Sequence, residues 1–373
     1  MTIRKIAVNT GGGDAPGLNA VIRAVTLSAT QRGWEVWGIR HGYRGLLEGD
    51  GDGLVRLDRE AVRGITHLGG SILGAASRDD PFRYPVLRDG QRERADLSAL
   101  LVERFIARGF DALVALGGDG SLRLAADLLA RGLPRVVAVP KTIDNDLAGT
   151  DVTFGFETAI TTATDAIDKL HTTAQAHERV MVVEVMGRDA GWIALYSGLA
   201  GGADVILLPE IPFELDRVAE KIAQRERAGR TFSIVVVAEG AHPVGGEALF
   251  KSVHRGQERG QSLGGIAELV AQEIAEKTGK ETRSLVLGHL QRGGSPVTAD
   301  RVLALQLGCA ATRMLAEADG SGMVAMRGGA PRFVPLDEAT RGLRQVPLDS
   351  NVVQSARDLG LCFGDERPGA FAG

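Results

Sequence analysis

A cation, a hydroxyl, two carboxylates and an amide stand together in the sequence KTIDND at residues 141–146. The preceding apolar run, residues 135–139, predicts a buried strand. Polar groups of this kind are costly to bury without partners, so we expect them at an open strand end. In α/β proteins such strand ends build the ligand site. We therefore interpret residues 141–146 as the chemical centre, although Asp144 taken alone is also compatible with a simple turn.

Two glycine-rich turns, residues 10–17 and 117–121, each stand between an apolar strand pattern and a helical pattern. Free backbone N–H groups at a helix start point toward a bound anion, so this arrangement predicts a phosphate site. The first turn has neither a Walker A ending nor a clean dinucleotide fingerprint. Asp119, in the second turn, is placed to hold a hard cation such as Mg²⁺. A packing turn or an ordinary helix cap is the alternative for each.

Strand and helix patterns alternate along most of the chain, which predicts parallel sheets with helices on both faces. The first sheet would carry both glycine turns and the polar stretch, and the second would begin near residue 155. Expected strands are residues 5–9, 34–39, 112–116, 135–139, 179–185, 204–208, 233–238 and 283–287. Expected helices are residues 18–31, 97–107, 122–130, 155–174, a segment ending at 199, 215–228, 263–277 and 297–318. Residues 243–260 are predicted to form a surface loop, and the tail after residue 360 is predicted to be loosely held.

Length and composition indicate an ordinary globular chain of about two domains. Of its 373 residues 44% are hydrophobic, and 43 Lys plus Arg against 47 Asp plus Glu give a net charge of −4, which argues against a nucleic-acid partner. Its two cysteines, Cys309 and Cys362, have no metal or redox spacing. There is no signal-peptide pattern and no apolar run long enough for a membrane span. We expect a cytoplasmic protein without a membrane partner.

Five motifs in one order together resemble the 6-phosphofructokinases of the bacterial type. They are GGDAPG at residues 12–17, GGDGS at 117–121, KTIDND at 141–146, EVMGR at 184–188 and GHLQRGG at 288–294. The resemblance extends from about residue 5 to residue 309 and is to the branch that includes both ATP- and pyrophosphate-dependent members. A Gly-Gly-Asp-Gly loop alone also occurs in NAD kinases and lipid kinases, so the resemblance depends on all five motifs in register.

The resemblance implies two similar Rossmann-like three-layer α/β/α domains with parallel-rich sheets and an active site in the cleft between them. Residues 1–154 plus about 290–335 would bind ATP and Mg²⁺. Residues 155–289 plus the C-terminal segment would bind fructose 6-phosphate. The reaction would transfer the γ-phosphoryl group of ATP to the 1-hydroxyl of fructose 6-phosphate. A related sugar phosphate, such as sedoheptulose 7-phosphate, stays open as the acceptor.

The matching motif positions imply residue roles. Asp144 would be the catalytic base, Thr142 a contact to the sugar phosphate or the transferred group, and Arg188 a support for the charge on that group. Asp119 would hold Mg²⁺, with Asp146 nearby. Donor-site positions are Gly12, Arg78, Asp79, Gly118, Asp119, Gly120 and Ser121. Acceptor-site positions are Thr142, Ile143, Asp144, Arg179, Met186, Gly187, Arg188, Glu239, Arg283, His289, Leu290, Gln291 and Arg292.

Four of these residues match the set around the 6-phosphate: Arg179, Arg283, His289 and Arg292. Guanidinium groups suit a phosphate dianion because they form forked hydrogen bonds. In the family, the equivalents of Arg179 and Arg283 reach across from a neighbouring subunit. The resemblance therefore implies a homodimer or homotetramer with shared active sites.

Two positions bear on the phosphoryl donor. In this family, glycine at the position of Gly120 leaves space for the α-phosphate of ATP. A carboxylate there, as in pyrophosphate users, fills that space and repels the anion. Lys141 favours pyrophosphate, because ATP-type bacterial members usually have glycine at this position and pyrophosphate-type members have lysine. Occlusion forbids binding whereas a cation only favours an anion, so we expect ATP. A pyrophosphate-dependent fructose 6-phosphate 1-phosphotransferase is the alternative.

Overall fold

The computed structural model describes residues 3–48, 53–76, 79–88, 90–248, 250–251, 262–317 and 320–365. The chain divides into two compact units. Unit 1 comprises Met1–Ile143, Leu147–Thr158 and Arg292–Leu343, and unit 2 comprises Asp144–Asp146, Ala159–Gln291 and Arg344–Gly373. The polar stretch at residues 141–146 thus begins in unit 1 and passes into unit 2 after Ile143.

The sheet of unit 1 has seven strands in the spatial order β15 (Ala330–Pro335), β14 (Gly322–Arg327), β7 (Val136–Pro140), β6 (Ala112–Gly117), β1 (Lys5–Thr10), β2 (Glu35–Ile39) and β3 (Leu54–Leu57). Neighbouring strands are parallel except at the two edges, where β3 and β15 are antiparallel to their neighbours. Because β1, β6 and β7 are parallel, the segments that follow them meet at one edge of the sheet.

Helices cover both faces of this sheet. They are α1 (Leu18–Thr30), α2 (Arg44–Leu47), α3 (Ser98–Ala107), α4 (Asp119–Ala130), α9 (Thr298–Glu317) and α10 (Leu336–Ala339). Alternation along β1 sends Ile6 and Val8 into the core with α1 and α9, and Ala7 into the core with α3 and α4. Helices α1 and α9 approach closely, since a Cβ atom on Gly308 would lie 2.7 Å from the Cβ of Ala24.

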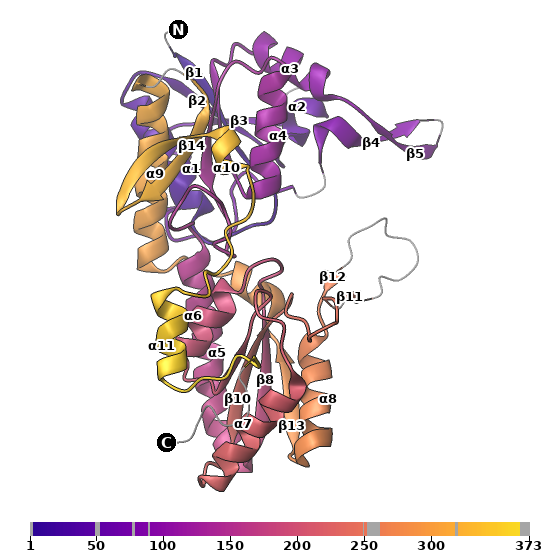
Figure 1. The fold of residues 1–373 in the computed structure, drawn as a ribbon. Helices are drawn as coiled ribbons and strands as arrows, with labels where there is room; N and C mark the ends of the chain where they lie inside the picture. The colour runs from indigo at the N-terminus through magenta and orange to yellow at the C-terminus, as the bar shows by residue number, and fades with distance from the viewer. Residues whose placement is uncertain are drawn as a thin grey trace. The chain divides into compact units, whose positions relative to one another are not determined.

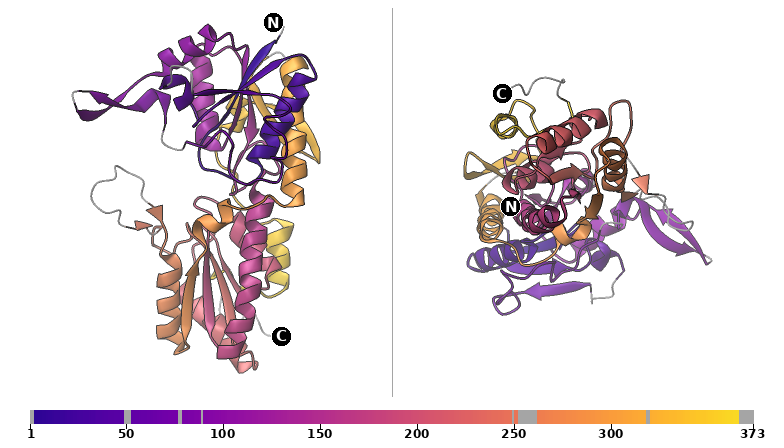
Figure 2. Two further views of the ribbon diagram at one scale, coloured as in Figure 1. Left: turned by 180° about the vertical axis from the view of Figure 1, so that it is seen from behind. Right: turned by 90° about the horizontal axis from the view of Figure 1, so that it is seen from below.

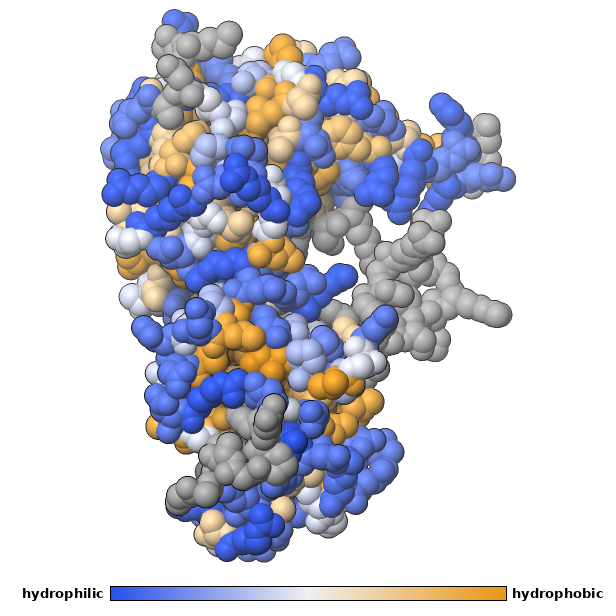
Figure 3. Space-filling view, viewed as in Figure 1, coloured by the Kyte–Doolittle hydropathy of each residue, from blue (hydrophilic) through white to orange (hydrophobic). Residues whose placement is uncertain are grey.

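A two-stranded hairpin, β4 (Tyr84–Arg88) and β5 (Gln91–Ala95), follows the short 3₁₀ helix η1 (Pro81–Arg83). It extends away from the body of unit 1 in Figures 1 and 2. Its surface is hydrophilic in Figure 3. The sequence did not predict this hairpin, because its strands are largely exposed and carry no continuous apolar run.

The sheet of unit 2 has four strands, all parallel, in the order β13 (Thr282–Val286), β8 (Val180–Val185), β10 (Ser233–Ala238) and β9 (Val205–Leu207). Its helices are α5 (Phe156–His177, whose first residues belong to unit 1), α6 (Trp192–Ala200), α7 (Leu215–Arg227), α8 (Ile266–Thr278) and α11 (Asn351–Asp358). Helices α7 and α8 cover one face, and α8 and α5 flank the strands on opposite sides in Figures 1 and 2. A short pair, β11 (Phe250–Lys251) and β12 (Ser262–Leu263), is antiparallel.

The predicted class, parallel-rich sheets between helical layers, is confirmed in both units. The expectation of a loose tail is wrong for residues 361–365. Cys362 pairs with Val205 at the edge of the sheet, and Cys362 and Phe363 are 1% and 0% exposed. This apolar segment completes the core of unit 2, which outweighs the loosening effect of the nearby glycines. Most of the predicted loop at residues 243–260 lies outside the described residues.

Candidate active site

The first glycine turn begins where β1 ends and is fixed by backbone hydrogen bonds. Gly11 N donates to Leu116 O at 2.8 Å, and Gly12 N donates to Ala76 O at 3.0 Å. Gly12 has φ +73, a conformation that favours glycine. A Cβ atom there would lie 3.4 Å from both Nζ of Lys141 and Oγ of Ser121. Gly12, Ser121 and Lys141, from three different motifs, are therefore neighbours in unit 1.

The second turn leads into α4, which begins at Asp119, earlier than the pattern indicated. Gly117 has to be glycine, because a Cβ atom would lie 2.2 Å from the Cβ of Ser121. A Cβ atom on Gly120 would meet nothing within 4 Å. Both carboxylate oxygens of Asp119 accept from Nε of Arg123 at 3.0 Å, and this side chain is 28% exposed. The helix start therefore presents one carboxylate and an open position beside it.

Lys141 is 4% exposed and closely tied to both glycine turns. Its backbone N donates to Gly117 O at 3.0 Å, and its ammonium group donates to Gly13 O. Buried cations need such partners. Next to it, Thr142 O accepts from Oγ1 of Thr153 at 2.7 Å. These bonds fix the start of the polar stretch against the two glycine turns.

Arg292 also lies against the first glycine turn. Its Nη1 donates to Asp14 O at 3.3 Å and would be 3.2 Å from a Cβ atom on Gly13. Asp79 is held elsewhere: its side chain is 4% exposed and pairs with Nη2 of Arg44 at 3.1 Å. That hydrogen bond is the main cause of a raised pKa of Arg44. Arg78, predicted beside the donor, lies outside the described residues.

The carboxyl ends of β8 and β10 bring several predicted acceptor residues together in unit 2. Glu239 N donates to Val185 O at 2.9 Å, and Gly240 N donates to Gly187 O at 3.1 Å. A Cβ atom on Gly240 would lie 1.8 Å from Arg188 O, so only glycine permits this approach. The predicted residues at this end are Met186, Gly187, Arg188 and Glu239.

The 3₁₀ helix η2 (Gly288–Arg292) connects to the same end through Gln291. This side chain is 0% exposed; its Oε1 accepts from Met186 N at 3.3 Å and its Nε2 donates to Gly288 O at 3.1 Å. The side chains of His289 and Leu290 are exposed. Gln291 therefore aligns the loop, while His289 is accessible to a ligand.

Arg179 and Arg283 lie at the opposite, amino end of this sheet. Both pair with Glu281, Arg179 at 2.9 Å and Arg283 at 2.7 Å, and the hydrogen bond from Arg179 is the main cause of a lowered pKa of Glu281. Because β8 has six residues, its two ends are about 20 Å apart. A single chain therefore does not bring these arginines to Met186 and its neighbours.

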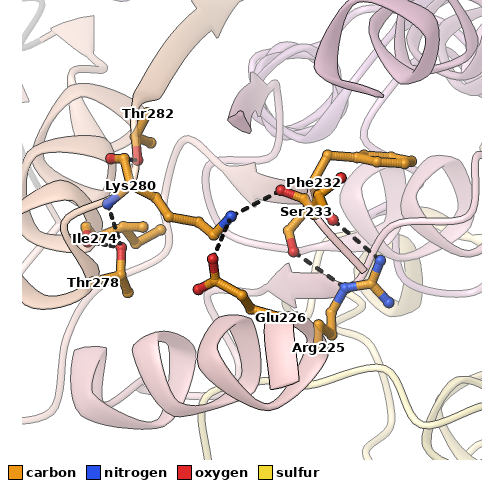
Figure 4. A network of polar contacts seen from close by, with 9 residues as sticks. Arg225, Glu226, Phe232, Ser233, Ile274, Thr278, Lys280 and Thr282 are labelled. Atoms are coloured by element: carbon orange, nitrogen blue, oxygen red, sulfur yellow. Dashed lines mark hydrogen bonds and ion pairs between the residues drawn. The ribbon is translucent and has the colours of Figure 1, made fainter. Parts of the chain in front are cut away.

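A polar network stabilises this amino end (Figure 4). Lys280 Nζ donates to Thr231 O at 2.9 Å and pairs with Glu226 at 3.1 Å, which links the start of β13 to α7. Nε of Arg225 donates to Oγ of Ser233 at 3.1 Å, which links α7 to the start of β10. The backbone that carries the two arginines is thus firmly held.

Sequence reasoning missed three residues that hold these motifs: Arg44, Asp300 and Arg344. Asp300 is 0% exposed and accepts from Gly155 N at 2.8 Å, Thr158 N at 2.7 Å and Oγ1 of Thr158 at 2.6 Å, and burial raises its pKa. An aspartate at a helix start is typical of a local cap, so nothing in the sequence indicated that it caps a different helix, α5. Arg44 and Arg344 stand outside every motif.

Two further findings concern only the part of the chain that the structure describes. No helix there is long and apolar enough to cross a membrane. No group of three or more His, Cys, Asp or Glu side chains there could hold a metal ion.

Known proteins match the chain over nearly its whole length. A family model described as phosphofructokinase matches residues 5–315. An ATP-dependent 6-phosphofructokinase of Chloroflexus aurantiacus is 50% identical over 97% of this chain and 98% of that protein. An ATP-dependent 6-phosphofructokinase 2 of Clostridium perfringens is 47% identical over 97% and 99%. A solved structure of a pyrophosphate-dependent phosphofructokinase from Marinobacter aquaeolei has a TM-score of 0.77 and 24% identity over 98% of this chain and 93% of that one, which shows a shared fold.

Proposed function

The chain belongs to the phosphofructokinase family, and we infer that it transfers the γ-phosphoryl group of ATP to the 1-hydroxyl group of fructose 6-phosphate. The observation that carries this inference is 50% identity to an ATP-dependent 6-phosphofructokinase over 97% of the chain. The products are fructose 1,6-bisphosphate and ADP. We further propose which residues bind the donor, which bind the acceptor and which act on the transferred group.

Unit 1 is assigned to the donor. Its two glycine turns and the ends of β1, β6 and β7 present backbone N–H groups and the side chains of Ser121 and Lys141 around one place. Such an arrangement suits phosphate groups. Unit 2 is assigned to the acceptor, because the carboxyl ends of β8 and β10 gather Met186, Arg188 and Glu239.

In the proposed reaction the 1-hydroxyl oxygen attacks the γ-phosphorus. The new O–P bond forms as the bond from that phosphorus to the β–γ bridging oxygen breaks, and ADP leaves with that oxygen's electron pair. Asp144 takes the proton of the hydroxyl, and Arg188 and Thr142 stabilise charge on the transferred group. Phosphoryl transfer needs little covalent help, so positioning and charge neutralisation supply most of the rate. The side chain of Arg188 is 62% exposed and pairs with Asp189 at 3.7 Å, which leaves it accessible to a ligand.

Asp119 would hold Mg²⁺, which when bound neutralises charge on the β- and γ-phosphates. The fit is reasonable, because a single carboxylate at a helix start, 28% exposed, can join phosphate oxygens and water around a hard cation. Arg123 would then give up part of its hold on this carboxylate.

Pyrophosphate as donor is the second candidate, and Lys141 is the observation that favours it. The ammonium group of Lys141 already has a partner in Gly13 O, so this lysine has a structural role with either donor. Gly120 favours ATP, since the space beside it is open. The relatives from Chloroflexus aurantiacus and Clostridium perfringens are named as ATP-dependent enzymes, which agrees with ATP as the donor.

Self-association is part of the proposal. Arg179 and Arg283 can contact the 6-phosphate only if they serve the acceptor site of another copy of the chain. Along the sheet, Arg179 lies about 20 Å from the carboxyl end of β8, and Arg283, which pairs with Met181, lies about 13 Å from it. Strand β13, which carries Arg283, is an edge strand of that sheet, and its Leu285 and Val286 are 37% and 40% exposed. Exposed apolar edge strands are natural sites for pairing with another chain.

Replacing Asp144 with Asn tests the proposed chemistry. With Mg²⁺, ATP and fructose 6-phosphate, the wild type should form fructose 1,6-bisphosphate and ADP in equal amounts. Asp144→Asn should lower kcat by roughly 10²–10⁴-fold with little change in KM, because proton transfer is lost while binding contacts stay. ³¹P NMR identifies the product of the wild type, and steady-state rates measure the loss of kcat in the variant. A wild type that makes no bisphosphate, or a fully active variant, would refute the proposal.

A further inference from the structure

Asn145, next to the proposed base, is held in an unusual backbone conformation. Its φ is +53, a region that residues other than glycine rarely adopt, although Asn tolerates it better than most. Such a conformation persists only when its surroundings impose it. Two hydrogen bonds to the backbone at and after Asn145 come from a distant segment of unit 2.

Arg344 contacts this backbone twice. Its own N donates to Asp146 O at 2.7 Å, and its Nη1 donates to Asn145 O at 3.4 Å. Two consecutive carbonyl groups that follow Asp144 are thus bound by one residue. Arg344 lies 199 positions after Asn145 in the chain, so local sequence does not account for this contact.

Arg344 is itself fixed by Trp192. The guanidinium carbon lies 4.3 Å from the ring centroid, and Nε1 of Trp192 donates to Arg344 O at 3.0 Å. Trp192 is 4% exposed and is the first residue of α6, shortly after Arg188. A stacked guanidinium on a buried indole is held in a defined orientation. Arg344 can therefore transmit the position of α6 to the backbone around Asn145.

The two residues after Arg344 strengthen this link. Nε2 of Gln345 donates to Asp189 O at 3.3 Å. Val346 N donates to Oε1 of Glu210 at 2.9 Å, and the same carboxylate accepts from Gly191 N at 3.0 and 3.1 Å. The segment from Arg344 to Val346 thus contacts both the backbone after Asp144 and the segment after Arg188.

We propose that Arg344, stacked on Trp192, is a positioning residue that holds the backbone of Asp144–Asp146 in the geometry needed for phosphoryl transfer. This rests on the proposed function, in which Asp144 and Arg188 act on the same reacting group. A displacement of about 1 Å at a reacting group can cost roughly 10²-fold in rate. Arg344 acts through Asn145 and Asp146 and needs no contact with substrate.

The substitution Arg344→Met tests the proposal, because it removes the guanidinium group and keeps an apolar side chain of similar length. Arg344→Met should lower kcat, and the single-turnover rate, by roughly 10–100-fold with little change in KM for ATP. Arg344→Lys should recover much of this loss, because it keeps a cation over Trp192 and a donor for Asn145 O. The bond from the backbone N of residue 344 remains in both variants, which favours folding.

Arg357 provides a matched control in the same unit. Its guanidinium carbon lies 4.8 Å from the Phe363 centroid and its Nη1 donates to Asp365 at 3.1 Å, so Arg357→Met also removes a stacked arginine. This control should reduce thermal stability while leaving kcat unchanged. The proposal is overturned if Arg344→Met keeps the wild-type kcat, or if Arg357→Met loses as much kcat as Arg344→Met.

Hydrogen exchange of backbone amides gives a readout that does not depend on activity. Arg344→Met should speed exchange in a peptide covering residues 143–148 and leave exchange in α11 as in the wild type. Should Arg344→Met not fold, Trp192→Phe keeps the ring and removes the donor to Arg344 O, and faster exchange at residues 143–148 is again expected. Unchanged exchange there would overturn the proposal. Hydrogen exchange is measured without substrate, so its result does not depend on whether the wild type is active. A wild type without activity would refute the proposed function and leave the exchange test of Arg344 valid.

Discussion

Lys141 and Gly120 give opposite indications about the phosphoryl donor when only their identities are considered. The structure explains how both can occur in one chain. Lys141 is 4% exposed and donates to Gly13 O, so it supports the first glycine turn whichever donor binds. The backbone at Gly120 needs no glycine, because a Cβ atom there would meet nothing within 4 Å. Glycine at this position is therefore better explained by the space it leaves for a ligand than by the fold.

Gly120→Asp should abolish the use of ATP and leave the fold intact. A carboxylate there would occupy the space of the α-phosphate and repel it. Gly120→Ala is the control, because it adds a methyl group without charge and should keep more of the activity. Steady-state rates with ATP, and thermal unfolding followed by circular dichroism, measure the two effects. Full ATP activity in Gly120→Asp would show that the steric argument is wrong.

Local sequence context was enough to predict a candidate site from the glycine turns and the polar strand ends. Such a prediction is possible because the ends of parallel strands meet at one edge of a sheet. Arg44, Asp300 and Arg344 were not found, because their roles depend on contacts with segments far away in the chain. The carboxylate of Asp79 pairs with Arg44, and its place beside the donor stays a prediction.

The start of α5 is the element on which several motifs depend. Phe154 forms a β-bridge with Lys141, and the following Gly155 has φ +101 and approaches the first glycine turn, since a Cβ atom there would lie 2.8 Å from the Cβ of Ala15. Asp300 caps this helix from α9. One buried carboxylate therefore holds the segment that supports both the first turn and the polar stretch.

Asp300→Asn should destabilise the protein in a way that depends on pH. Near neutral pH the loss should be about 1–3 kcal/mol, because an amide offers one oxygen where the carboxylate offers two. Burial raises the pKa of Asp300, so the protonated carboxyl group adds further stability that is complete below the unfolded pKa of about 3.9 and is lost as pH rises through the folded pKa. The difference in free energy of unfolding between wild type and variant should therefore be larger at about pH 3.9 than at neutral pH.

Urea unfolding of both proteins at these two pH values measures this difference. Glu157, whose pKa is also raised chiefly by burial, is present in both proteins. Burial likewise raises the pKa of Asp204, which accepts from Ile234 N in unit 2, so Asp204→Asn should show the same sign. A difference for Asp300→Asn that grows toward neutral pH would contradict this assignment.

At the scale of elements, apolar periodicity predicted the buried strands and helices well, and it failed where burial is low. The β4–β5 hairpin has exposed strands with charged residues, so it lacks the pattern on which such predictions depend. The segment 361–365 was misread because glycine and proline nearby suggested a loose tail, whereas Cys362 and Phe363 are buried.

The whole molecule raises the question of how many chains make one active site. Arg179 and Arg283 lie at the amino end of the unit 2 sheet, and Met186, Arg188 and Glu239 lie at its carboxyl end. Along the sheet these arginines lie about 20 Å (Arg179) and about 13 Å (Arg283) from that end, which is more than a rearrangement of side chains spans. Our proposal therefore requires that each acceptor site take these two arginines from another copy.

Complementation between two inactive chains tests this requirement. Asp144→Asn lacks the base, and the double variant Arg179→Ala, Arg283→Ala lacks the phosphate ligands that it would lend to its neighbour. Each should be nearly inactive alone. A co-expressed hybrid, purified through two different tags, should regain activity because one site then has both the base and the arginines.

A hybrid of Asp144→Asn with Arg188→Ala is the control. Both of these residues would serve the site of their own chain, so no complete site can form and activity should stay low. The requirement for a second chain would be refuted if the hybrid with the Arg179 and Arg283 changes stayed as inactive as this control.

The central claim, that this chain phosphorylates fructose 6-phosphate with ATP, is tested most directly by comparing two donors on one preparation of the wild type. Fructose 6-phosphate and Mg²⁺ are supplied with either ATP or pyrophosphate at equal concentration, and the initial rate of fructose 1,6-bisphosphate formation is measured. We expect rapid formation with ATP and none above the enzyme-free blank with pyrophosphate. Rapid formation with pyrophosphate and none with ATP would contradict it.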